Sequence, residues 1–181
     1  MDYLDALLWR NGEFADQGFI PDLKMMPSGK LLIIGCVDPR VDPETIFKLE
    51  SGEAAVIRNV GGRVNPAALE TIKLLRAVAQ AAGGSTGPAP NLIVLHHTDC
   101  GITHCQHYTP GLLAQHMGVA PDELDAQAIA DPYEAVALDV AALRADPDVA
   151  ARYTVSGLVY DVATGKVEMV VPPTRLPPEE A

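Results

Sequence analysis

Short apolar runs of strand length alternate with helix starts along this chain, and this alternation constrains its fold more than any other feature. The runs at 31–37 and 91–96 are continuous, which is typical of strands covered on both faces, and a further strand is expected at 54–58. Helix starts, each an N-cap residue followed by proline, lie at Asp42-Pro43, Asn65-Pro66 and Asp131-Pro132. The pattern predicts an α/β fold with a mostly parallel central sheet flanked by helices.

The N-terminal residues depart from this pattern. Apolar side chains there fall on one helical stripe, at Tyr3, Leu4, Leu7 and Leu8. The stripe predicts a short amphipathic helix over residues 2–9, opened by Asp2. Residues 11–29 are rich in glycine, proline and polar side chains, so we expect them to be extended.

The chain is expected to contain a single domain with a short extension at each end. We assign residues 1–29 to an N-terminal helical arm, 30–171 to the α/β domain and 172–181 to a tail rich in proline and glutamate. Near the end of the domain, residues 153–162 alternate as a strand, and Ala163-Thr164-Gly165 turns the chain into a last apolar segment. Low-complexity residues are confined to the tail and to a Gly/Pro-rich stretch at 83–90.

Charge and composition exclude several classes of protein. No apolar run approaches the roughly 18 residues that a membrane-spanning helix needs. The formal net charge of −11 repels phosphate backbones and anionic lipids, so we expect neither a nucleic acid nor a membrane as partner. The N-terminus carries acidic residues where a signal peptide would carry lysine or arginine, and the 3 cysteines do not fit a disulfide framework. These features favour a cytoplasmic location.

Chemically useful residues follow directly after the predicted strands, where parallel sheets bind their ligands. The segments are Cys36–Arg40, Arg58–Gly62 and His96–Gly101. The first and third combine cysteine with histidine, and this pairing suits zinc better than magnesium or calcium. Because the ligands come from two distant strand ends, the site differs from a zinc finger. Three protein ligands would leave the fourth tetrahedral position to water, as in a catalytic zinc site.

His96 and His97 are alternatives for the imidazole ligand. Adjacent side chains of a strand point to opposite faces, so only one of the two can share an ion with Cys36. The spacing from His97 to Cys100 lets the chain turn and bring both to one metal, which favours His97. Taken singly, such a cysteine can be a small buried apolar residue and such a histidine merely hydrogen-bonded. The combination is more specific, and it predicts one zinc per chain.

The ordered set of motifs resembles the β-class carbonic anhydrases, including their carbonyl sulfide and carbon disulfide hydrolase relatives. The motifs are C-x-D-x-R at Cys36–Arg40, R-N-x-G at Arg58–Gly61, H-x-x-C-G at His97–Gly101 and G-x-x-Y-D-x-x-T-G at Gly157–Gly165. The resemblance extends from about Leu31 to Val171. It implies that Cys36, His97 and Cys100 hold zinc and that Asp38 and Arg40 form the catalytic dyad. It also implies a homodimer, or a multiple of dimers, in which the arm wraps a partner subunit.

This resemblance implies reversible hydration of carbon dioxide to bicarbonate and a proton. One alternative is hydrolysis of carbonyl sulfide or carbon disulfide by the same zinc hydroxide, because all three substrates are linear. Another is a non-catalytic zinc protein that binds bicarbonate or a partner chain, but such a protein needs no Asp38–Arg40 dyad. Pro39, Val60, Gly62 and His96 depart from the residues common in the family, which leaves the substrate preference open.

Asp38, His104, His107 and Cys105 each allow more than one interpretation. The sequence does not decide whether Asp38 pairs with Arg40 or becomes a fourth zinc ligand. His104 lies four residues after Cys100, so a helix could build a second metal site there, and either His104 or His107 could relay protons at the site's mouth. We expect Cys105 to be a packed free thiol, because a disulfide to Cys100 would remove a zinc ligand.

Overall fold

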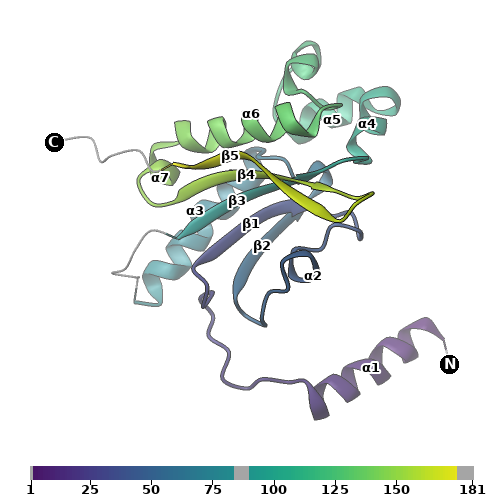
Figure 1. Cartoon of the computed structure of the whole chain (residues 1–181), viewed down its shortest axis with the longest axis vertical. Coiled ribbons are helices and arrows are strands. Elements are labelled where there is room, and N and C mark those ends of the chain that lie inside the picture. The colour runs from purple at the N-terminus through teal and green to yellow at the C-terminus, as the bar shows by residue number, and fades with distance from the viewer. Residues whose placement is uncertain (1, 84–89, 175–181) are drawn as a thin grey trace.

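A five-stranded sheet forms the centre of the computed structural model, which describes residues 2–83 and 90–174. Its strand order is β2-β1-β3-β4-β5, and every neighbouring pair is parallel except β4 with β5. The strands are β1 (Leu31–Cys36), β2 (Ala54–Asn59), β3 (Asn91–His97), β4 (Thr154–Asp161) and β5 (Lys166–Thr174). The predicted α/β fold with a mostly parallel sheet is therefore confirmed (Figure 1).

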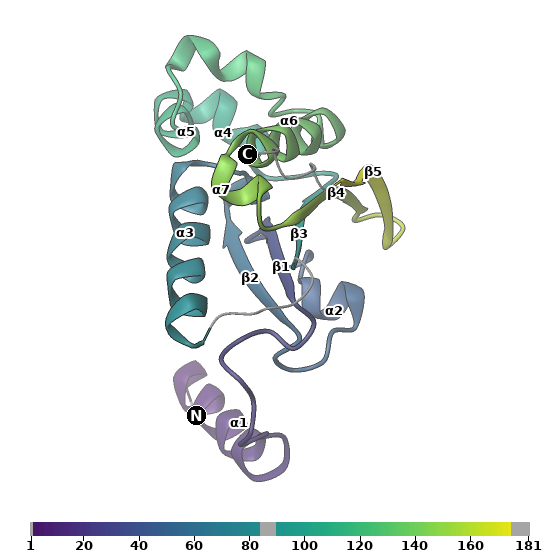
Figure 2. The same cartoon turned by 90° about the vertical axis from the view of Figure 1, so that its left-hand side faces the viewer.

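Helices cover the two faces of the sheet unequally (Figure 2). On one face, Ile72 of α3 (Pro66–Ala81) and Val136, Val140 and Leu143 of α6 (Pro132–Ala145) pack in one cluster with the strands. On the other face, Ile46 and Phe47 of α2 (Pro43–Phe47) pack against Ile33 and Leu95. The short helix α7 (Pro147–Ala150) adds Val149 to the first cluster. Burial of these apolar side chains between the layers is the main stabilising term of the fold.

A smaller cluster lies beyond the carboxyl end of the sheet. It joins α4 (Ile102–Tyr108), α5 (Pro110–Met117) and the 3-10 helix η2 (Pro121–Gln127). Ile102, Leu113, Met117 and Leu124 form its buried centre together with Ile129. These elements therefore surround the strand ends at which the sequence places its metal ligands.

The predicted helix starts are confirmed by their capping bonds. The side chain of Asp42 accepts from the backbone N–H of Thr45, that of Asn65 from Ala68, and that of Asp131 from Tyr133 and Glu134. Each cap satisfies backbone donors that the first helical turn leaves free and is worth about 1 kcal/mol. The caps explain why each connection from a strand ends in a helix at these positions.

The N-terminal helix is longer than the sequence analysis predicts. Helix α1 spans Tyr3–Gln17, so the expectation of an extended chain from residue 11 was wrong for residues 11–17. A capping box between Asp2 and Asp5 starts the helix, and the single Gly12 costs only about 1 kcal/mol against alanine. No residue of α1 is buried, and the helix lies apart from the sheet in both views (Figures 1 and 2).

The C-terminal boundary also differs from expectation. Strand β5 continues to Thr174, so it includes the first residues of the segment that we assigned to the tail. The remainder of that segment, 175–181, and residues 84–89 of the Gly/Pro-rich stretch lie outside the described residues. In the described part of the chain, no helix combines the length and the apolar character that crossing a bilayer requires.

Candidate metal centre

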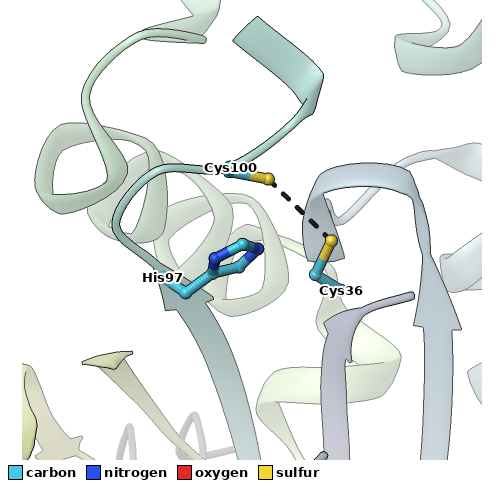
Figure 3. A group of neighbouring side chains, drawn as sticks. All are labelled: Cys36, His97 and Cys100. Carbon is cyan, nitrogen blue, oxygen red and sulfur yellow. Dashed lines mark hydrogen bonds between the residues drawn. The ribbon is translucent and has the colours of Figure 1, made fainter. Parts of the chain in front are cut away.

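Three side chains from two neighbouring strand ends meet at the carboxyl edge of the sheet (Figure 3). Cys36 is the last residue of β1, and His97 is the last residue of β3, the strand that pairs with β1 in parallel. Cys100 lies in the turn between β3 and α4. The parallel register thus brings together residues that are 64 positions apart in the sequence.

The spacing of the three side chains fits a tetrahedral zinc ion. One potential ligand atom from each residue lies within 4.8 Å of the other two, and the Sγ atoms of Cys36 and Cys100 are 3.8 Å apart. Two thiolates on a tetrahedral zinc, each at about 2.3 Å, are separated by roughly 3.8 Å. The donor set of two sulfurs and one imidazole is one that zinc prefers over magnesium or calcium.

His97 is oriented for a ligand through Nε2. Its Nδ1 lies 2.9 Å from the carbonyl oxygen of Thr98, so Nδ1 carries the proton and donates it to that oxygen. This tautomer leaves a lone pair on Nε2, which is buried and has no hydrogen-bond partner. A buried polar atom without a partner costs free energy, and a metal ion at the two sulfurs would remove that cost.

The thiols of Cys36 and Cys100 are hydrogen-bonded to each other. The hydrogen bond from Cys100 lowers the pKa of Cys36 to about 4, although burial opposes this shift and the His97 side chain supports it. The same hydrogen bond, together with burial, raises the pKa of Cys100. A bound zinc ion deprotonates the thiols that coordinate it, so metal binding would release a proton from Cys100.

His96 is not part of the group of three and belongs to a buried polar cluster. Its Nε2 lies 3.1 Å from Oδ2 of Asp139, which also accepts from Nε of Arg63 at 2.9 Å and from the backbone N–H of Val64 at 3.0 Å. Arg63 and Asp139 are 1% and 4% exposed. Burial raises the pKa of Asp139, but the hydrogen bond from His96 and the charge of Arg63 outweigh it and lower the pKa.

Sequence reasoning missed Arg63 and Asp139. The available signal was Asp139 itself, a charged residue among the apolar residues of the helix predicted after Asp131. Such a residue is rarely fully buried unless it is paired. Its partner Arg63 lies 76 residues earlier, however, and no local pattern connects the two.

Asp38 and Arg40 form a bidentate ion pair beside the cysteines. Nη2 of Arg40 lies 2.7 Å from Oδ2 of Asp38, and its Nε lies 3.1 Å from Oδ1. The hydrogen bonds from Arg40 lower the pKa of Asp38 to about 2, so the carboxyl group is ionised at neutral pH. The backbone N–H of Asp38 points at Sγ of Cys36 at 3.5 Å. In this structure Asp38 therefore pairs with Arg40, which is one of the two arrangements that the sequence left open.

The side chain of Arg58 and the close approach of Gly62 hold the backbone of residues 36–38 in place. Arg58 of β2 donates to the carbonyl oxygens of Cys36 at 2.9 Å and Asp38 at 2.8 Å. Gly62, in the 3-10 helix η1 (Val60–Gly62), has φ +65°, and a Cβ there would lie 2.9 Å from the backbone nitrogen of Cys36. The residue must therefore be glycine for η1 to approach the end of β1 so closely.

A small cavity lies against the proposed ligands. It has a volume of about 140 Å³, and its lining includes two of the three, His97 and Cys100, together with the apolar residues Ile102, Ile129 and Ala135. Pockets for drug-sized molecules are larger, about 300–1,000 Å³. The cavity therefore suits a substrate of a few atoms.

The remaining candidates do not build a second site. Within residues 2–83 and 90–174, Cys36, His97 and Cys100 form the one group of three such side chains close enough to hold a metal ion. His104 and His107 are therefore not part of a second group in this range. Cys105 is a free thiol that packs against the cluster of α4, α5 and η2, as predicted.

Three comparisons with known proteins, by family model, by sequence and by structure, agree with one another. A family model described as carbonic anhydrase matches residues 31–167. Beta-carbonic anhydrase 1 of Mycobacterium bovis is 31% identical over 173 residues, which are 95% of this chain and 100% of that protein. A carbonic anhydrase structure from Streptococcus mutans has a TM-score of 0.70 and 31% identity, covering 94% of this chain and 98% of the other. A carbon disulfide hydrolase structure shares the fold, with a TM-score of 0.52, 24% identity and coverage of 92% and 89%.

Proposed function

Because the chain belongs to the β-class carbonic anhydrase family, we propose that it catalyses the reversible hydration of carbon dioxide to bicarbonate and a proton. In this proposal Cys36, His97 and Cys100 hold one zinc ion per chain, and Asp38 with Arg40 forms the catalytic dyad. The observation that carries the proposal is the group of three ligand atoms within 4.8 Å of one another, next to the Asp38–Arg40 ion pair. A structural zinc site would need no such pair beside it and would normally close with a fourth protein ligand.

The fit of zinc rests on the ligand atoms themselves. Their sulfur–sulfur distance, the free Nε2 of His97 and the mixed thiolate–imidazole donor set all match a tetrahedral ion. When bound, zinc lowers the pKa of a coordinated water and supplies hydroxide near neutral pH. The chain offers three ligands, so one position is left for that water.

Asp38 is the residue that we assign to orienting the reacting water. Its carboxylate is ionised. Oδ1 accepts from both the backbone N–H and Nε of Arg40, whereas Oδ2 accepts mainly from Nη2 and keeps a second lone pair. It can therefore accept a hydrogen bond from the water and turn the water's own lone pair toward the carbon of the substrate. Arg40 holds this carboxylate by two nitrogens, which fixes its plane and keeps its negative charge.

The experiment that tests this function is an assay of zinc-loaded protein on three substrates. Initial rates on carbon dioxide, carbonyl sulfide and carbon disulfide are compared for the same preparation, with zinc measured per chain. We expect carbon dioxide to be the preferred substrate. Hydrolysis of the sulfur substrates is the second candidate, since a carbon disulfide hydrolase shares the fold. Failure to turn over all three, at full zinc occupancy, would leave a non-catalytic zinc or bicarbonate-binding protein as the function.

The Asp38→Asn variant tests the role of the carboxylate. The amide keeps the size of the side chain but loses the charge and donates where the carboxylate accepts. We expect carbon dioxide hydration to fall by about 100-fold, because a positioned proton acceptor contributes at least that much. Stopped-flow rates with a pH indicator give the result. Zinc content and melting temperature should match the wild type, and unchanged hydration at equal zinc would remove Asp38 from the mechanism.

We further propose that the arm of residues 1–29 packs on a second copy of the chain. Large apolar side chains of this arm are exposed, among them Leu8 at 63%, Trp9 at 58% and Phe14 at 54%. Helix α1 buries none of its own residues, so its apolar stripe has no cover within the described chain. Exposed apolar surface of this kind is typical of a protein–protein interface.

Deletion of residues 1–20 is expected to weaken the dimer. The truncated chain loses the apolar stripe of α1, and with it the surface that we assign to the partner. Sedimentation velocity over a range of concentrations should show dissociation to monomers at concentrations where the full chain stays dimeric. A charge-preserving variant, Leu8→Ser with Trp9→Ser, should dissociate in the same range. Equal masses for the three proteins at every concentration would contradict the assignment.

A further inference from the structure

We propose that Asp99 is a positioning residue that ties the Asp38–Arg40 pair to the loop carrying His97 and Cys100. The proposal rests on the function assigned above to Asp38 and Arg40. It concerns a residue in the turn between β3 and α4 for which the motif comparison gave no role. The guanidinium of Arg40 contacts this turn as well as its own loop.

The contacts of Arg40 divide between two loops. Nη1 of Arg40 donates to Oδ2 of Asp99 at 2.8 Å, and Nη2 donates to the carbonyl oxygen of Asp99 at 2.9 Å. Nη2 and Nε also donate to the carboxylate of Asp38. Arg40 therefore bridges two acidic residues, one following β1 and one following β3. Arg40 and Asp99 are 59 residues apart in the sequence.

This bridge supplies a restraint that the Asp38–Arg40 pair lacks on its own. Asp38 and Arg40 lie two residues apart in one loop, so their side chains could move together relative to the proposed metal ligands. Arg58 fixes the backbone of this loop through carbonyl oxygens, but it does not hold the head group of Arg40. Asp99 does, and it stands directly before Cys100. The carboxylate of Asp38 is thus positioned relative to the ligand loop through Arg40.

The backbone of Asp99 supports this assignment. Its φ of +54° lies in the left-handed region, which is unfavourable for residues other than glycine and is tolerated best by asparagine and aspartate. In this conformation both the carboxylate and the carbonyl oxygen of Asp99 reach Arg40. A glycine would adopt this turn more easily but would lose the carboxylate contact.

The contact between Asp99 and Arg40 is too exposed to contribute much to stability, so its role is to position the side chains. The side chains of Asp99 and Arg40 are 76% and 47% exposed. Ion pairs this exposed contribute little to the free energy of unfolding, because water screens the attraction. Loss of the Asp99 carboxylate should therefore leave folding unaffected while it removes the contact to Nη1 of Arg40, so that, among the described residues, the backbone carbonyl of Asp99 is the one remaining link between Arg40 and this turn.

Two substitutions that preserve the backbone conformation test the proposal. Asp99→Gly removes the side chain, whereas Asp99→Asn keeps an oxygen that can still accept from Nη1. We expect kcat/KM for carbon dioxide hydration to fall by about 10-fold in Asp99→Gly, mainly through kcat, and by less than about 3-fold in Asp99→Asn. Zinc content and melting temperature should equal those of the wild type. Asp148→Asn is the matched control, because it removes an exposed carboxylate from Arg76 at 2.6 Å, away from the site.

A double-mutant cycle shows whether Asp99 acts through Arg40. In an Arg40→Ala background, the further change Asp99→Gly should alter kcat/KM by less than about 2-fold. A 10-fold loss in both backgrounds would mean that Asp99 acts independently of Arg40 and would overturn the proposal. Wild-type activity in Asp99→Gly would overturn it equally.

Crystal structures can test the role of Asp99 even if the proposed function fails. If the zinc-loaded wild type turns over none of the three substrates, the proposed function fails, but the positioning role can still be decided. Crystal structures of zinc-loaded wild type and Asp99→Gly should then differ in the position of the Arg40 guanidinium and the Asp38 carboxylate. Superimposable side chains at both residues would overturn the role of Asp99.

Discussion

Cys100→Ser is expected to purify with less than about a tenth of a zinc ion per chain and to lose at least 100-fold in carbon dioxide hydration. The serine hydroxyl is not a thiolate and leaves Cys36 and His97 as the only protein ligands from the group of three. Substitutions that merely touch a zinc ligand from outside already cost about 10–100-fold, so removal of a ligand should cost more. Zinc is measured by elemental analysis after dialysis, and activity by stopped flow.

The neighbouring histidines provide a matched control for this prediction. His97→Ala should lose zinc as Cys100→Ser does, because Nε2 of His97 faces the sulfur atoms without another partner. His96→Ala should keep zinc, because the side chain of His96 contacts Asp139 instead. The opposite result for the two histidines would show that the ligand is assigned to the wrong face of β3. Full zinc in Cys100→Ser would remove Cys100 from the site.

The location of the candidate site could be predicted from sequence because it follows from the parallel direction of the strands. Cys36 and His97 each end an apolar run, and parallel strands bring their carboxyl ends to one edge of a sheet. The alternation of side chains along a strand also separates His96 from His97: His96 contacts Asp139, whereas His97 lies with Cys36 and Cys100. The closeness of Cys36 and His97 is thus a consequence of the parallel sheet, whereas their role as metal ligands stays a prediction.

The elements that sequence reasoning missed depend on contacts between distant residues or on cooperativity. The length of α1 was underestimated because Gly12 and its polar neighbours suggested a break, while a capped helix without proline continues through them. The role of Asp99 could not be inferred because its partner, Arg40, lies on another strand end. The pairing of Arg63 with Asp139 likewise requires α6 to pack on the sheet first.

Asp139→Asn is expected to destabilise the protein more than any surface substitution. The carboxylate receives Nε and Nη2 of Arg63, the backbone N–H of Val64 and Nε2 of His96. Asparagine has one acceptor oxygen and no charge, so the guanidinium of Arg63 would stay buried without a counter-ion. Breaking a buried ion pair from one side costs about 3–5 kcal/mol. For a chain of this length, that loss lowers the melting temperature by roughly 6–20 °C.

Differential scanning calorimetry of zinc-loaded protein measures this effect against two comparisons. Asp148→Asn breaks an exposed pair with Arg76 and should shift the melting temperature by less than about 2 °C. The double variant Arg63→Met with Asp139→Leu removes both charges, and His96 loses its acceptor, whereas Asp139→Asn keeps one oxygen that can accept from it. It should melt above Asp139→Asn, because an uncompensated buried charge costs more than an apolar replacement of the pair.

Two outcomes would contradict this account. If Asp139→Asn has the same melting temperature as Asp148→Asn, the buried ion pair contributes no more to stability than an exposed one. If the double variant melts lowest, the destabilisation comes from lost hydrogen bonds and not from the charge left on Arg63.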